Sequence, residues 1–474
     1  MAEEYDLVIL GGGTGGYVAA IRASQLGLKT AIVEKGKLGG TCLHKGCIPS
    51  KALLRSAEVY HTSLKSEEYG VILGEVKLDF PKVQQRKEKI VNQLYAGVQH
   101  LMKQGKIDVF EGIGRILGPS IFSPLPGTIS VEMNNGNENE MLIPKNVIIA
   151  TGSRPRTLEG LEIDGVSVVT SEEALEFTEL PKSIIIVGGG VIGIEWASML
   201  NDFGAKVTVL EYADRIIPTE DHEISKEMEK LLKKKGITIH TNAKVLSETL
   251  LHHSDHVSIS AEINHTNEEF TADKILVSVG RQANVEGIGL TNTEAVVEKG
   301  FISVNDYYQT KESHIYAIGD CIGGLQLAHA ASHEGITAVE HIAGLKPHAI
   351  DYSLVSKCIY SSPEAASVGY TENEAKEKGF ELKIGKFPFK AVGKALVYGE
   401  SDGFVKIIAD AKTNDILGVH MIGPHVTDMI SEAGLARVLD ATPWEISQTI
   451  HPHPSLSEAI GEAALAVDGI AIHM

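Results

Sequence analysis

The most constraining feature of the sequence is a glycine-rich turn, Gly11–Gly16, that directly follows an apolar run ending at Leu10. The run has the length of a buried parallel strand, and the apolar pattern after the turn predicts a helix that ends near Gly27. A second short strand then ends at Glu34, 23 residues after Gly11. Strand, G-x-G-x-x-G turn, helix, strand and terminal acid together predict a dinucleotide-binding βαβ unit, whereas the turn alone would be weak evidence.

Each glycine of this turn has its own expected task. Gly11 should form the tight turn, Gly13 should let the backbone approach a pyrophosphate, and Gly16 should allow close packing of helix against strand. The helix would point its N-terminus at the anion, and Glu34 would accept a hydrogen bond from a ribose hydroxyl.

The same plan recurs in the middle of the chain. Gly188, Gly190 and Gly193 occupy the same frame after an apolar strand, and the next strand ends at Glu211, again 23 residues after the first glycine. Two matches at one spacing predict an α/β fold with two doubly wound nucleotide-binding domains and two bound dinucleotides. Glu211 would repel a 2′-phosphate, and the first cation after it is Arg215, so NAD is favoured over NADP unless Glu211 is only a surface acid.

Two other apolar runs, Val147–Pro155 and Ile315–Cys321, stop at small polar turns. The first would lead from one nucleotide-binding domain into the next. The second places Asp320 at the C-terminal end of a strand, which is where α/β sheets bind ligands. Taken alone, each run is as well explained by an ordinary junction between a strand and a turn.

Composition narrows the class of protein. The chain has 474 residues, enough for about three domains, and a hydrophobic fraction of 43% that can supply their cores. Its net charge of −19 argues against a nucleic-acid partner and permits a basic protein partner, although acidic surfaces most often serve solubility. The N-terminal stretch does not resemble a signal peptide, and the most apolar stretch, Ser183–Ile194, is too short to cross a membrane. We therefore expect a cytoplasmic protein that has no membrane partner.

A close pair of cysteines, Cys42 and Cys47, stands in the stretch Gly39–Leu54 of a chain that has only four. The pair could be half of a metal site, a structural disulfide or a working redox pair. A zinc site usually needs a second close pair, but Cys321 and Cys358 are far apart in sequence and are expected to be core residues. A metal role is therefore disfavoured, and no metal site is predicted.

The spacing of the pair favours redox chemistry. Residues five apart in a regular helix have Cα atoms about 8.7 Å apart, whereas a disulfide tolerates about 6.8 Å at most. A bridge therefore requires an irregular backbone, which Gly46 and Pro49 can provide, and a strained bridge is more easily reduced. Lys45 and Lys51 add positive charge that favours thiolates.

Two further stretches have simple patterns. Phe80–Lys106 has apolar residues at helical spacing (Val83, Val91, Leu94, Val98 and Leu101) and predicts a helix with a solvated charged face. Glu132–Met141 is typical of a hairpin turn between two strands.

Taken together and in order, these stretches resemble a known family. The cysteine stretch GGTCLHKGCIPSKALL, both glycine turns, ATGSRP, IYAIGD and the C-terminal HPHPSLSEA look like the FAD-dependent pyridine nucleotide–disulfide oxidoreductases over essentially the whole chain. The combination is specific, although each piece alone is not. Within the family, the chain is most similar to the members that oxidise protein-bound dihydrolipoamide to lipoamide in 2-oxo-acid dehydrogenase complexes, passing the electrons through FAD to NAD.

The resemblance implies an architecture of four domains. An FAD-binding domain would cover residues 1–150 and an NAD-binding domain residues 151–280. A central domain over residues 281–350 would complete the FAD site, and an α+β interface domain over residues 351–474 would form a homodimer.

The resemblance also assigns roles to residues. Cys42 would exchange with the substrate thiols and Cys47 would face the flavin, as the two halves of a redox-active disulfide. Lys51 would lie close to the flavin ring and Glu195 close to the nicotinamide. The expected FAD contacts are Gly11, Gly13, Gly16, Glu34, Lys51, Gly114 and Asp320. The expected NAD contacts are Gly188, Gly190, Gly193, Glu211, Val245 and Gly280. The remaining expected cofactor contacts are Thr151, Gly152, Arg281 and Ala328.

By the same resemblance, His453 and Glu458 would be the catalytic acid–base pair. The chain has 19 histidines, so the sequence by itself does not single out His453. The family places this histidine at the active site of the other subunit, which would make the dimer necessary for activity. His451 is expected to have a packing or supporting role.

The implied partners are the lipoyl domain and the subunit-binding segment of the acyltransferase component of a 2-oxo-acid dehydrogenase complex. His44 and Ala283 stand where the family commonly has Asn and Pro, which leaves only the subfamily open. The LHKGC form of the motif resembles that of branched-chain 2-oxo-acid complexes.

Three alternatives remain. Glutathione reductase and mercuric ion reductase have similar cysteine motifs, but Glu211 and the IPSKALL ending argue against the first. The missing metal domain and missing C-terminal cysteine pair argue against the second. The intact catalytic set argues against a redox-silent flavoprotein that serves as a scaffold.

Overall fold

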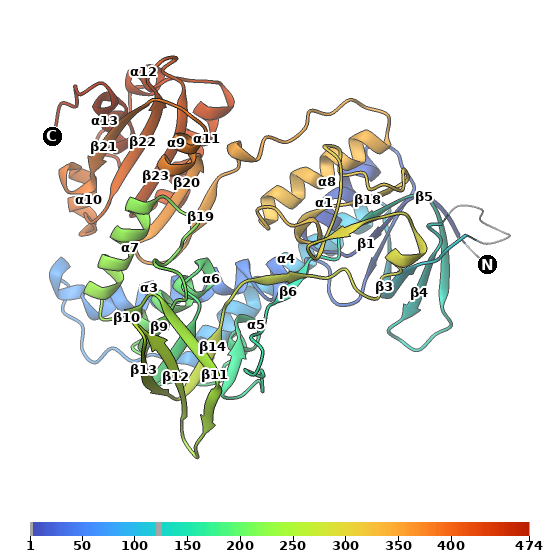
Figure 1. The fold of residues 1–474 in the computed structure, drawn as a ribbon, viewed down its shortest axis with the longest axis horizontal. Coiled ribbons are helices and arrows are strands. Elements are labelled where there is room, and N and C mark those ends of the chain that lie inside the picture. The colour runs from blue at the N-terminus through green and yellow to red at the C-terminus, as the bar shows by residue number, and fades with distance from the viewer. Residues whose placement is uncertain (1–2, 120–125, 474) are drawn as a thin grey trace. The chain divides into compact units, whose positions relative to one another are not determined.

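The computed structural model describes residues 3–119 and 126–473. The chain divides into two units, each of which collects segments from several places in the sequence (Figure 1). Unit 1 comprises Met1–Ala52, Lys82–Arg156 and Arg281–Ile350, and unit 2 comprises Leu53–Pro81, Thr157–Gly280 and Asp351–Met474. The four-domain division at residues 150, 280 and 350 stays a prediction.

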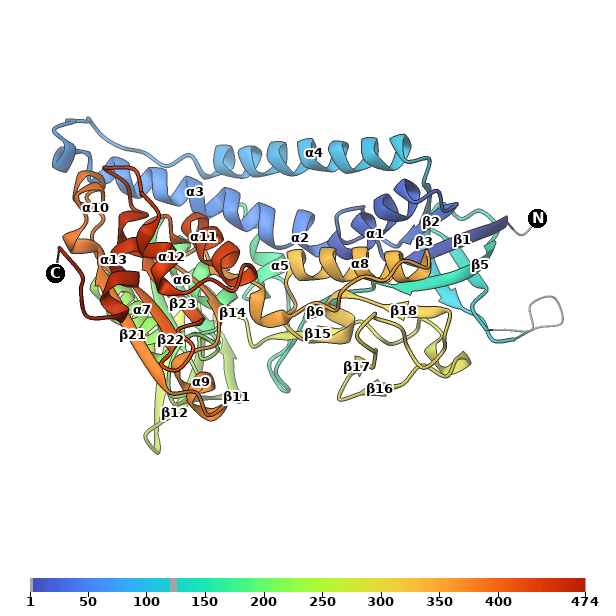
Figure 2. The same cartoon turned by 90° about the horizontal axis from the view of Figure 1, so that it is seen from above.

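Unit 1 is built on one sheet. Its strands are β1 (Glu3–Leu10), β2 (Thr30–Glu34), β3 (Asp108–Ile116), β4 (Ile129–Met133), β5 (Glu140–Ile149) and β18 (Ile315–Ala317). Five strands run parallel in the order β3-β2-β1-β5-β18, while β4 pairs antiparallel with both β3 and β5. The helices α1 (Thr14–Gln25) and α8 (Ala328–Ile342) lie side by side (Figure 2), and Arg22 of α1 donates a hydrogen bond to Glu340 of α8.

Both faces of this parallel sheet are buried, which explains why its strands are apolar at nearly every position. Along β1, Leu7 and Ile9 belong to one hydrophobic cluster, whereas Val8 and Leu10 belong to the cluster on the opposite face. Side chains alternate between the faces of a strand, so a strand covered on both sides needs apolar residues in both positions.

Smaller elements complete unit 1. They are α2 (Gly40–His44), β6 (Ser153–Pro155), β15 (Arg281–Ala283), η2 (Leu290–Asn292), β16 (Val297–Glu298), β17 (Phe301–Ile302) and η3 (Gly319–Ile322). Two long helices, α3 (Cys47–Leu64) and α4 (Phe80–Gln104), have residues in both units. The predicted helix over Phe80–Lys106 and the predicted hairpin turn between β4 and β5 are confirmed.

Unit 2 repeats the plan of unit 1. Its first sheet is parallel in the order β10-β9-β8-β14-β7, with β8 and β9 taking the places of β1 and β2. These strands are β7 (Val168–Thr170), β8 (Ser183–Val187), β9 (Lys206–Leu210), β10 (Thr238–His240) and β14 (Lys274–Val277). The accompanying elements are η1 (Ser66–Tyr69), α5 (Ser171–Ala174), α6 (Val191–Asp202), α7 (His222–Lys234) and an antiparallel sheet of β11 (Ala243–His252), β12 (Val257–Ile263) and β13 (Thr266–Ala272).

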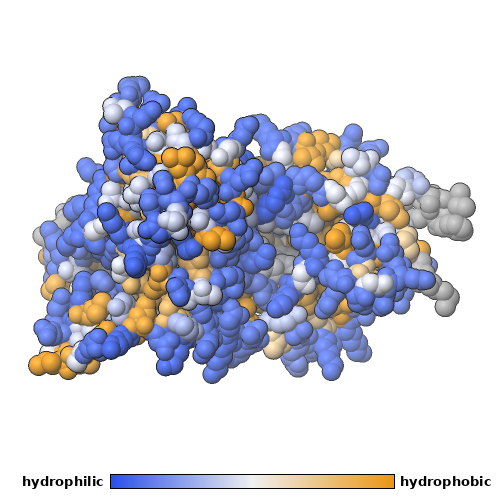
Figure 3. Space-filling model, turned by 90° about the horizontal axis from the view of Figure 1, so that it is seen from below, coloured by the Kyte–Doolittle hydropathy of each residue, from blue (hydrophilic) through white to orange (hydrophobic). Residues whose placement is uncertain are grey.

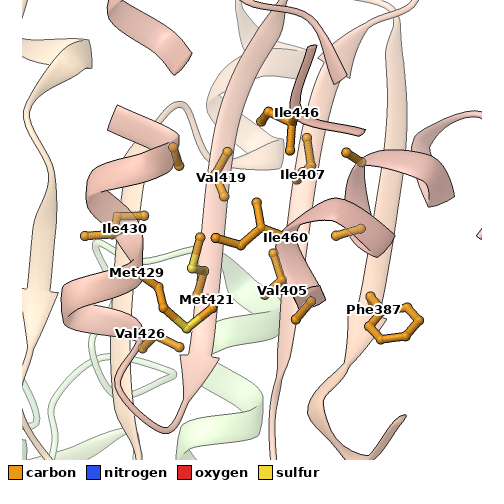
Figure 4. Packing of buried hydrophobic residues seen from close by; sticks show 14 of the residues in the cluster. Phe387, Val405, Ile407, Val419, Met421, Val426, Met429, Ile430, Ile446 and Ile460 are labelled. Atoms are coloured by element: carbon orange, nitrogen blue, oxygen red, sulfur yellow. The ribbon is translucent and has the colours of Figure 1, made fainter. Parts of the chain in front are cut away.

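The C-terminal part of unit 2 is an antiparallel sheet in the order β19-β20-β23-β22-β21. Its strands are β19 (Lys357–Ile359), β20 (Glu364–Gly369), β21 (Leu382–Pro388), β22 (Phe404–Asp410) and β23 (Ile416–Gly423). Its helices are η4 (Tyr352–Leu354), α9 (Glu372–Glu377), η5 (Phe389–Ala391), α10 (Gly393–Tyr398), α11 (Val426–Val438), α12 (Pro443–Gln448) and α13 (Glu458–Val467). Figure 4 shows the core between sheet and helices, where Met421 of β23 and Met429 of α11 meet Ile460 of α13.

The surface seen in Figure 3 is mostly hydrophilic, with scattered hydrophobic groups. None of the helices in the described part of the chain has the length and apolar content that a bilayer crossing requires.

Candidate functional site

The first glycine turn has the shape that a dinucleotide needs. Gly11 has a φ of +109°, and a Cβ atom there would collide with the carbonyl group of Ala150. A Cβ atom on Gly16 would collide with the carbonyl oxygen of Gly11, so only glycine permits this contact between helix and turn. A Cβ atom on Gly13, by contrast, would meet nothing within 4 Å. Open space therefore lies at the N-terminus of α1, where backbone N–H groups can bind a pyrophosphate.

Glu34 closes this turn from the end of β2. Its carboxylate accepts hydrogen bonds from the backbone N–H groups of Gly12 at 2.6 Å and Gly36 at 2.7 Å. Each carboxylate oxygen can accept more than one hydrogen bond, so a ribose hydroxyl can be bound at the same place. The turn and its acid thus fit the adenosine half of a dinucleotide.

The second glycine turn has the same construction. Gly188 has a φ of +107° and lies against the carbonyl group of Ser278, while Gly193 lies against Gly188. A Cβ atom on Gly190, at the start of α6, would again meet nothing within 4 Å. Glu211 accepts hydrogen bonds from the N–H groups of Gly189 and, at 2.6 Å, of Ala213. Both turns therefore fit the same class of ligand.

Other predicted cofactor contacts gather in unit 1. Ser153 donates a hydrogen bond to Asp320 and accepts one from Arg281 at 2.6 Å, and Arg281 Nε lies 3.7 Å from Asp320 Oδ2. Thr151 donates to the carbonyl oxygen of Asn284 at 2.6 Å. Gly152 has a φ of +68°.

The remaining predicted contacts are spread over both units. In unit 1, Gly114 lies on β3 against Leu10, and Ala328 is the first residue of α8. In unit 2, Val245 lies on β11 and Gly280 has a φ of +106°. Arg281 therefore belongs to unit 1, which contains the first glycine turn, and Gly280 belongs to unit 2, which contains the second.

The backbone is irregular between the two cysteines, as their spacing predicts. Helix α2 ends at His44, Lys45 has φ −135° and ψ 12°, and α3 begins at Cys47. The structure holds Cys42 and Cys47 as thiols, with Cys42 half-buried and Cys47 exposed. The hydrogen bond that Cys42 donates to Cys47, together with burial, raises the pKa of the Cys42 thiol, whereas Thr14 and the positive charge of Lys51 oppose this shift.

The cysteine stretch is tied directly to the first glycine turn. Gly39 donates a backbone hydrogen bond to Gly12 at 2.7 Å, and Gly40 approaches Gly13 so closely that a Cβ atom would lie 2.6 Å from its Cα. Thr14, the first residue of α1, forms a side-chain hydrogen bond with Cys42. The sequence gives no signal for this role of Thr14, because the residue occupies a variable position of the G-x-G-x-x-G pattern.

The predicted acid–base pair is formed in unit 2. His453 Nδ1 lies 2.8 Å from Glu458 Oε1, and the other carboxylate oxygen accepts a hydrogen bond from the N–H of Ser455 at 2.8 Å. Burial would raise the pKa of Glu458, but the Ser455 N–H and His453 hold it below its ordinary value. An ionised Glu458 requires Nδ1 to carry the proton, which leaves Nε2 as the basic atom of the neutral ring. The His453 side chain is 79% exposed.

His451 has a different environment. Its Nε2 lies 2.7 Å from Glu432 Oε1, and its ring lies against Gly461 of α13. The hydrogen bond to Glu432 raises the pKa of His451 despite partial burial. These contacts fit the supporting role that was expected for it.

Glu195 lies on α6, the helix that follows the second glycine turn. Its side chain is buried, and Oε1 accepts a hydrogen bond from the backbone N–H of Tyr360 at 3.0 Å. By unit, Cys42, Cys47 and Lys51 belong to unit 1, whereas Glu195 and the His453–Glu458 pair belong to unit 2. Of the other two cysteines, which were expected to be core residues, Cys321 is fully buried and donates a hydrogen bond to the carbonyl oxygen of Ile318. Cys358 is only half-buried.

Two protein-family models match the amino-acid sequence. The model described as pyridine nucleotide-disulphide oxidoreductase matches residues 5–335, and the model of the dimerisation domain of these enzymes matches residues 355–464. The chain therefore belongs to the pyridine nucleotide-disulphide oxidoreductase family. This confirms the predicted family and the predicted α/β fold class. It also confirms the prediction that the protein is an oxidoreductase that uses FAD and NAD.

Particular relatives narrow the activity. The chain is 76% identical over 473 residues to a dihydrolipoyl dehydrogenase of Bacillus subtilis (strain 168), with 100% of both chains covered. It is 43% identical over 477 residues to a dihydrolipoyl dehydrogenase of Zymomonas mobilis, again with 100% of both covered. Among solved structures, LpdA from Mycobacterium tuberculosis matches with a TM-score of 0.89 at 25% identity, covering 98% of this chain and 99% of that one. These relatives confirm the function predicted from the sequence, which is that of a dihydrolipoyl dehydrogenase.

Proposed function

We propose that this chain oxidises protein-bound dihydrolipoamide to lipoamide, with Cys42 and Cys47 as the pair that alternates between dithiol and disulfide. The observation that carries the proposal is the attachment of this pair to a dinucleotide-binding turn, through Thr14 and the contacts of Gly39 and Gly40. When bound, FAD would take two electrons from the dithiol and pass them to NAD as a hydride.

The chain's own residues handle thiols and protons. His453 Nε2 would remove a proton from one substrate thiol, and ionised Glu458 would stabilise the resulting imidazolium. The substrate thiolate attacks the Cys42 sulfur of the Cys42–Cys47 disulfide, so that a mixed disulfide forms and Cys47 leaves as a thiolate. The second substrate thiol loses its proton and displaces Cys42, which gives lipoamide and a reduced cysteine pair. The substrate has then lost two electrons and two protons.

The charges and hydrogen bonds around Cys42 support this order of reaction steps. The hydrogen bond to Cys47 raises the pKa of Cys42, which disfavours a thiolate on Cys42 in the reduced pair. Lys51 places a positive charge within reach of the pair and would stabilise a thiolate formed there.

The proposal includes the partners. The dimerisation-domain match supports a homodimer. We propose that His453 of each subunit serves the cysteine pair of the other, for which its exposure leaves it accessible. We further propose that the substrate is carried by a lipoyl domain, and that the subunit-binding segment of an acyltransferase component holds the dimer in a branched-chain 2-oxo-acid complex. The site of action would be the cytoplasm, where thiols are kept reduced.

The first experiment measures NADH formation by purified protein given dihydrolipoamide and NAD, with Cys47→Ser alongside. Rapid turnover by the wild type and none by the variant is the expected result. Activity with glutathione disulfide and NADPH instead would place the chain with the glutathione reductases. Inactivity with every disulfide or dithiol substrate would favour a binding module.

A second experiment tests the shared active site. Mixed dimers of Cys47→Ser and His453→Gln subunits contain one site with both residues intact if the histidine acts across the dimer. Such mixtures should therefore recover activity that neither pure variant has. Failure to recover any would mean that His453 acts within its own subunit or not at all.

A further inference from the structure

A lysine is buried in unit 2 among carboxylates. Lys406 of β22 has no exposed surface, and its Nζ lies 3.0 Å from Asp221, 3.0 Å from Glu223 and 2.7 Å from Glu372. Asp221 also accepts a hydrogen bond from the N–H of Glu372 at 3.2 Å. A buried ammonium group requires such partners, because its desolvation is otherwise too costly. Lys406 therefore holds the three acids together, while Lys386 is a second partner of Glu223 and Lys376 a second partner of Glu372.

Two of these acids belong to the start of α7. Asp221 is the N-cap residue of this helix, and Oδ1 accepts a hydrogen bond from the N–H of Glu223 at 3.0 Å as well as one from Lys406. One turn further on, Ser225 donates a hydrogen bond from its hydroxyl to the carbonyl oxygen of Ile216 at 2.7 Å. The start of α7 thus holds the segment that comes before it.

That segment supports the second glycine turn. Ile217 donates a backbone hydrogen bond to the carbonyl oxygen of Gly189 at 2.7 Å, and the Ile216 side chain lies against Gly189. Ile217 has a φ of +40°, which is unfavourable for a β-branched residue. Such a conformation persists only where the surroundings hold it, and the start of α7 contributes through the hydrogen bond from Ser225 to Ile216.

We propose that Lys406 is a positioning residue for the second dinucleotide site. By anchoring Asp221 and Glu223, it fixes α7, Ser225 then fixes Ile216, and the strained Ile217 turn holds Gly189 in the shape that binds the pyrophosphate. The identity of the ligand as NAD rests on the proposed function; the mechanical link from Lys406 to the turn does not. This link lies within unit 2, whereas the cysteine pair belongs to unit 1, so thiol exchange should be independent of it.

The experiment compares four proteins: wild type, Lys406→Met, Ser225→Ala and Lys235→Met. Lys235 is the matched control, because it forms a partly buried ion pair with Asp202 at 2.7 Å at the opposite end of α7. Three quantities are measured on purified flavoprotein: the dissociation constant of NAD, the rate of flavin reduction by dihydrolipoamide without NAD, and the melting temperature.

The expected result is a dissociation constant for NAD that rises about three- to thirtyfold in Lys406→Met. Ser225→Ala, which removes no charge and tests the relay even if Lys406→Met fails to fold, should show a smaller rise. Lys235→Met should lower the melting temperature without changing NAD binding, and all folded proteins should reduce the flavin at the same rate. Unchanged NAD binding in Ser225→Ala and in folded Lys406→Met, or an equal change in Lys235→Met, would overturn the proposal.

One outcome separates this proposal from the proposed function. Wild-type protein that binds NADPH and not NAD would contradict the proposed coenzyme. The same comparison made with NADPH would then decide the role of Lys406.

Discussion

Adding a methyl group at Gly190 should weaken NAD binding without harming the fold. Gly190 has φ −73° and ψ −176°, which an alanine adopts easily, and its added Cβ would meet nothing within 4 Å. Alanine is a poorer N-cap than glycine, so the expected loss of stability is about 1 kcal/mol or less. The methyl group would, however, occupy the space where the pyrophosphate must come within about 3 Å of the helix N–H groups.

The magnitude follows from the hydrogen bonds that are lost. A hydrogen bond to a charged group contributes about 1.5–3 kcal/mol, and 1.4 kcal/mol corresponds to a factor of ten in affinity. Losing one such bond should therefore weaken NAD binding at least about tenfold. Isothermal titration of the purified flavoprotein with NAD measures this directly, and flavin content should be unchanged because Gly13 is untouched.

Gly193→Ala is the matched control. Its Cβ would collide with the carbonyl oxygen of Gly188, so it should lower the melting temperature as well as NAD affinity. The reasoning would be refuted if Gly190→Ala protein were folded and bound NAD as tightly as the wild type. The pyrophosphate would then not lie against this glycine turn.

Three further predictions concern single side chains. Glu458→Gln removes the charge that orients and stabilises His453, so kcat should fall by about ten- to a hundredfold in steady-state assays; unchanged turnover would show that the pair is not catalytic. The pKa of His451 is raised by Glu432, so its stabilisation is complete below the ordinary value of about 6.5 and is lost as the pH rises through the higher folded value. His451→Gln should therefore lower the melting temperature more at about pH 6 than at about pH 9, and a deficit that does not shrink would contradict this. Cys321→Ala should keep turnover within about twofold, because the thiol is buried and bonds only weakly to backbone carbonyl oxygens; lost activity with normal flavin content would give it a chemical role.

The nucleotide-binding units were predictable because their signals are local. A strand, a turn and a helix lie within one short stretch, and the collisions at Gly11 and Gly16 show why the pattern requires glycine there. The same applies to Gly188 and Gly193. Local spacing also predicted the irregular backbone between the cysteines.

Periodicity was less reliable for deciding which residues of a helix are buried. Along α4, Val91, Val98 and Met102 are buried, whereas Leu94 and Leu101 are 44% and 41% exposed. Leu94 and Leu101 share the spacing of a buried face, but the described residues of the chain leave them exposed. Periodicity shows that a helix is amphipathic, and only the packing shows where its buried stripe ends.

The Lys406 cluster could not be predicted. Its members are separated by up to 185 residues, and a single lysine in the apolar strand FVKIIAD gives no sign of what it faces. The pairing of His453 with Glu458 needed the family resemblance, since nothing in the spacing distinguishes it from other histidine–glutamate pairs. Contacts between distant segments depend on topology, which local patterns do not encode.

The attachment of Gly39 and Gly40 to the first glycine turn has a consequence for how such a chain can change. The redox motif and the cofactor-binding motif are separated by a helix and a strand in the sequence, yet they share a backbone hydrogen bond and a contact that leaves no room for a side chain. A substitution at residue 40 would displace the loop that receives the dinucleotide, because its Cβ atom would lie 2.6 Å from Gly13 Cα, and a reshaped loop would displace the thiols. The two motifs are therefore constrained to change together, as one inherited module, so that neither can be grafted into another protein without the other.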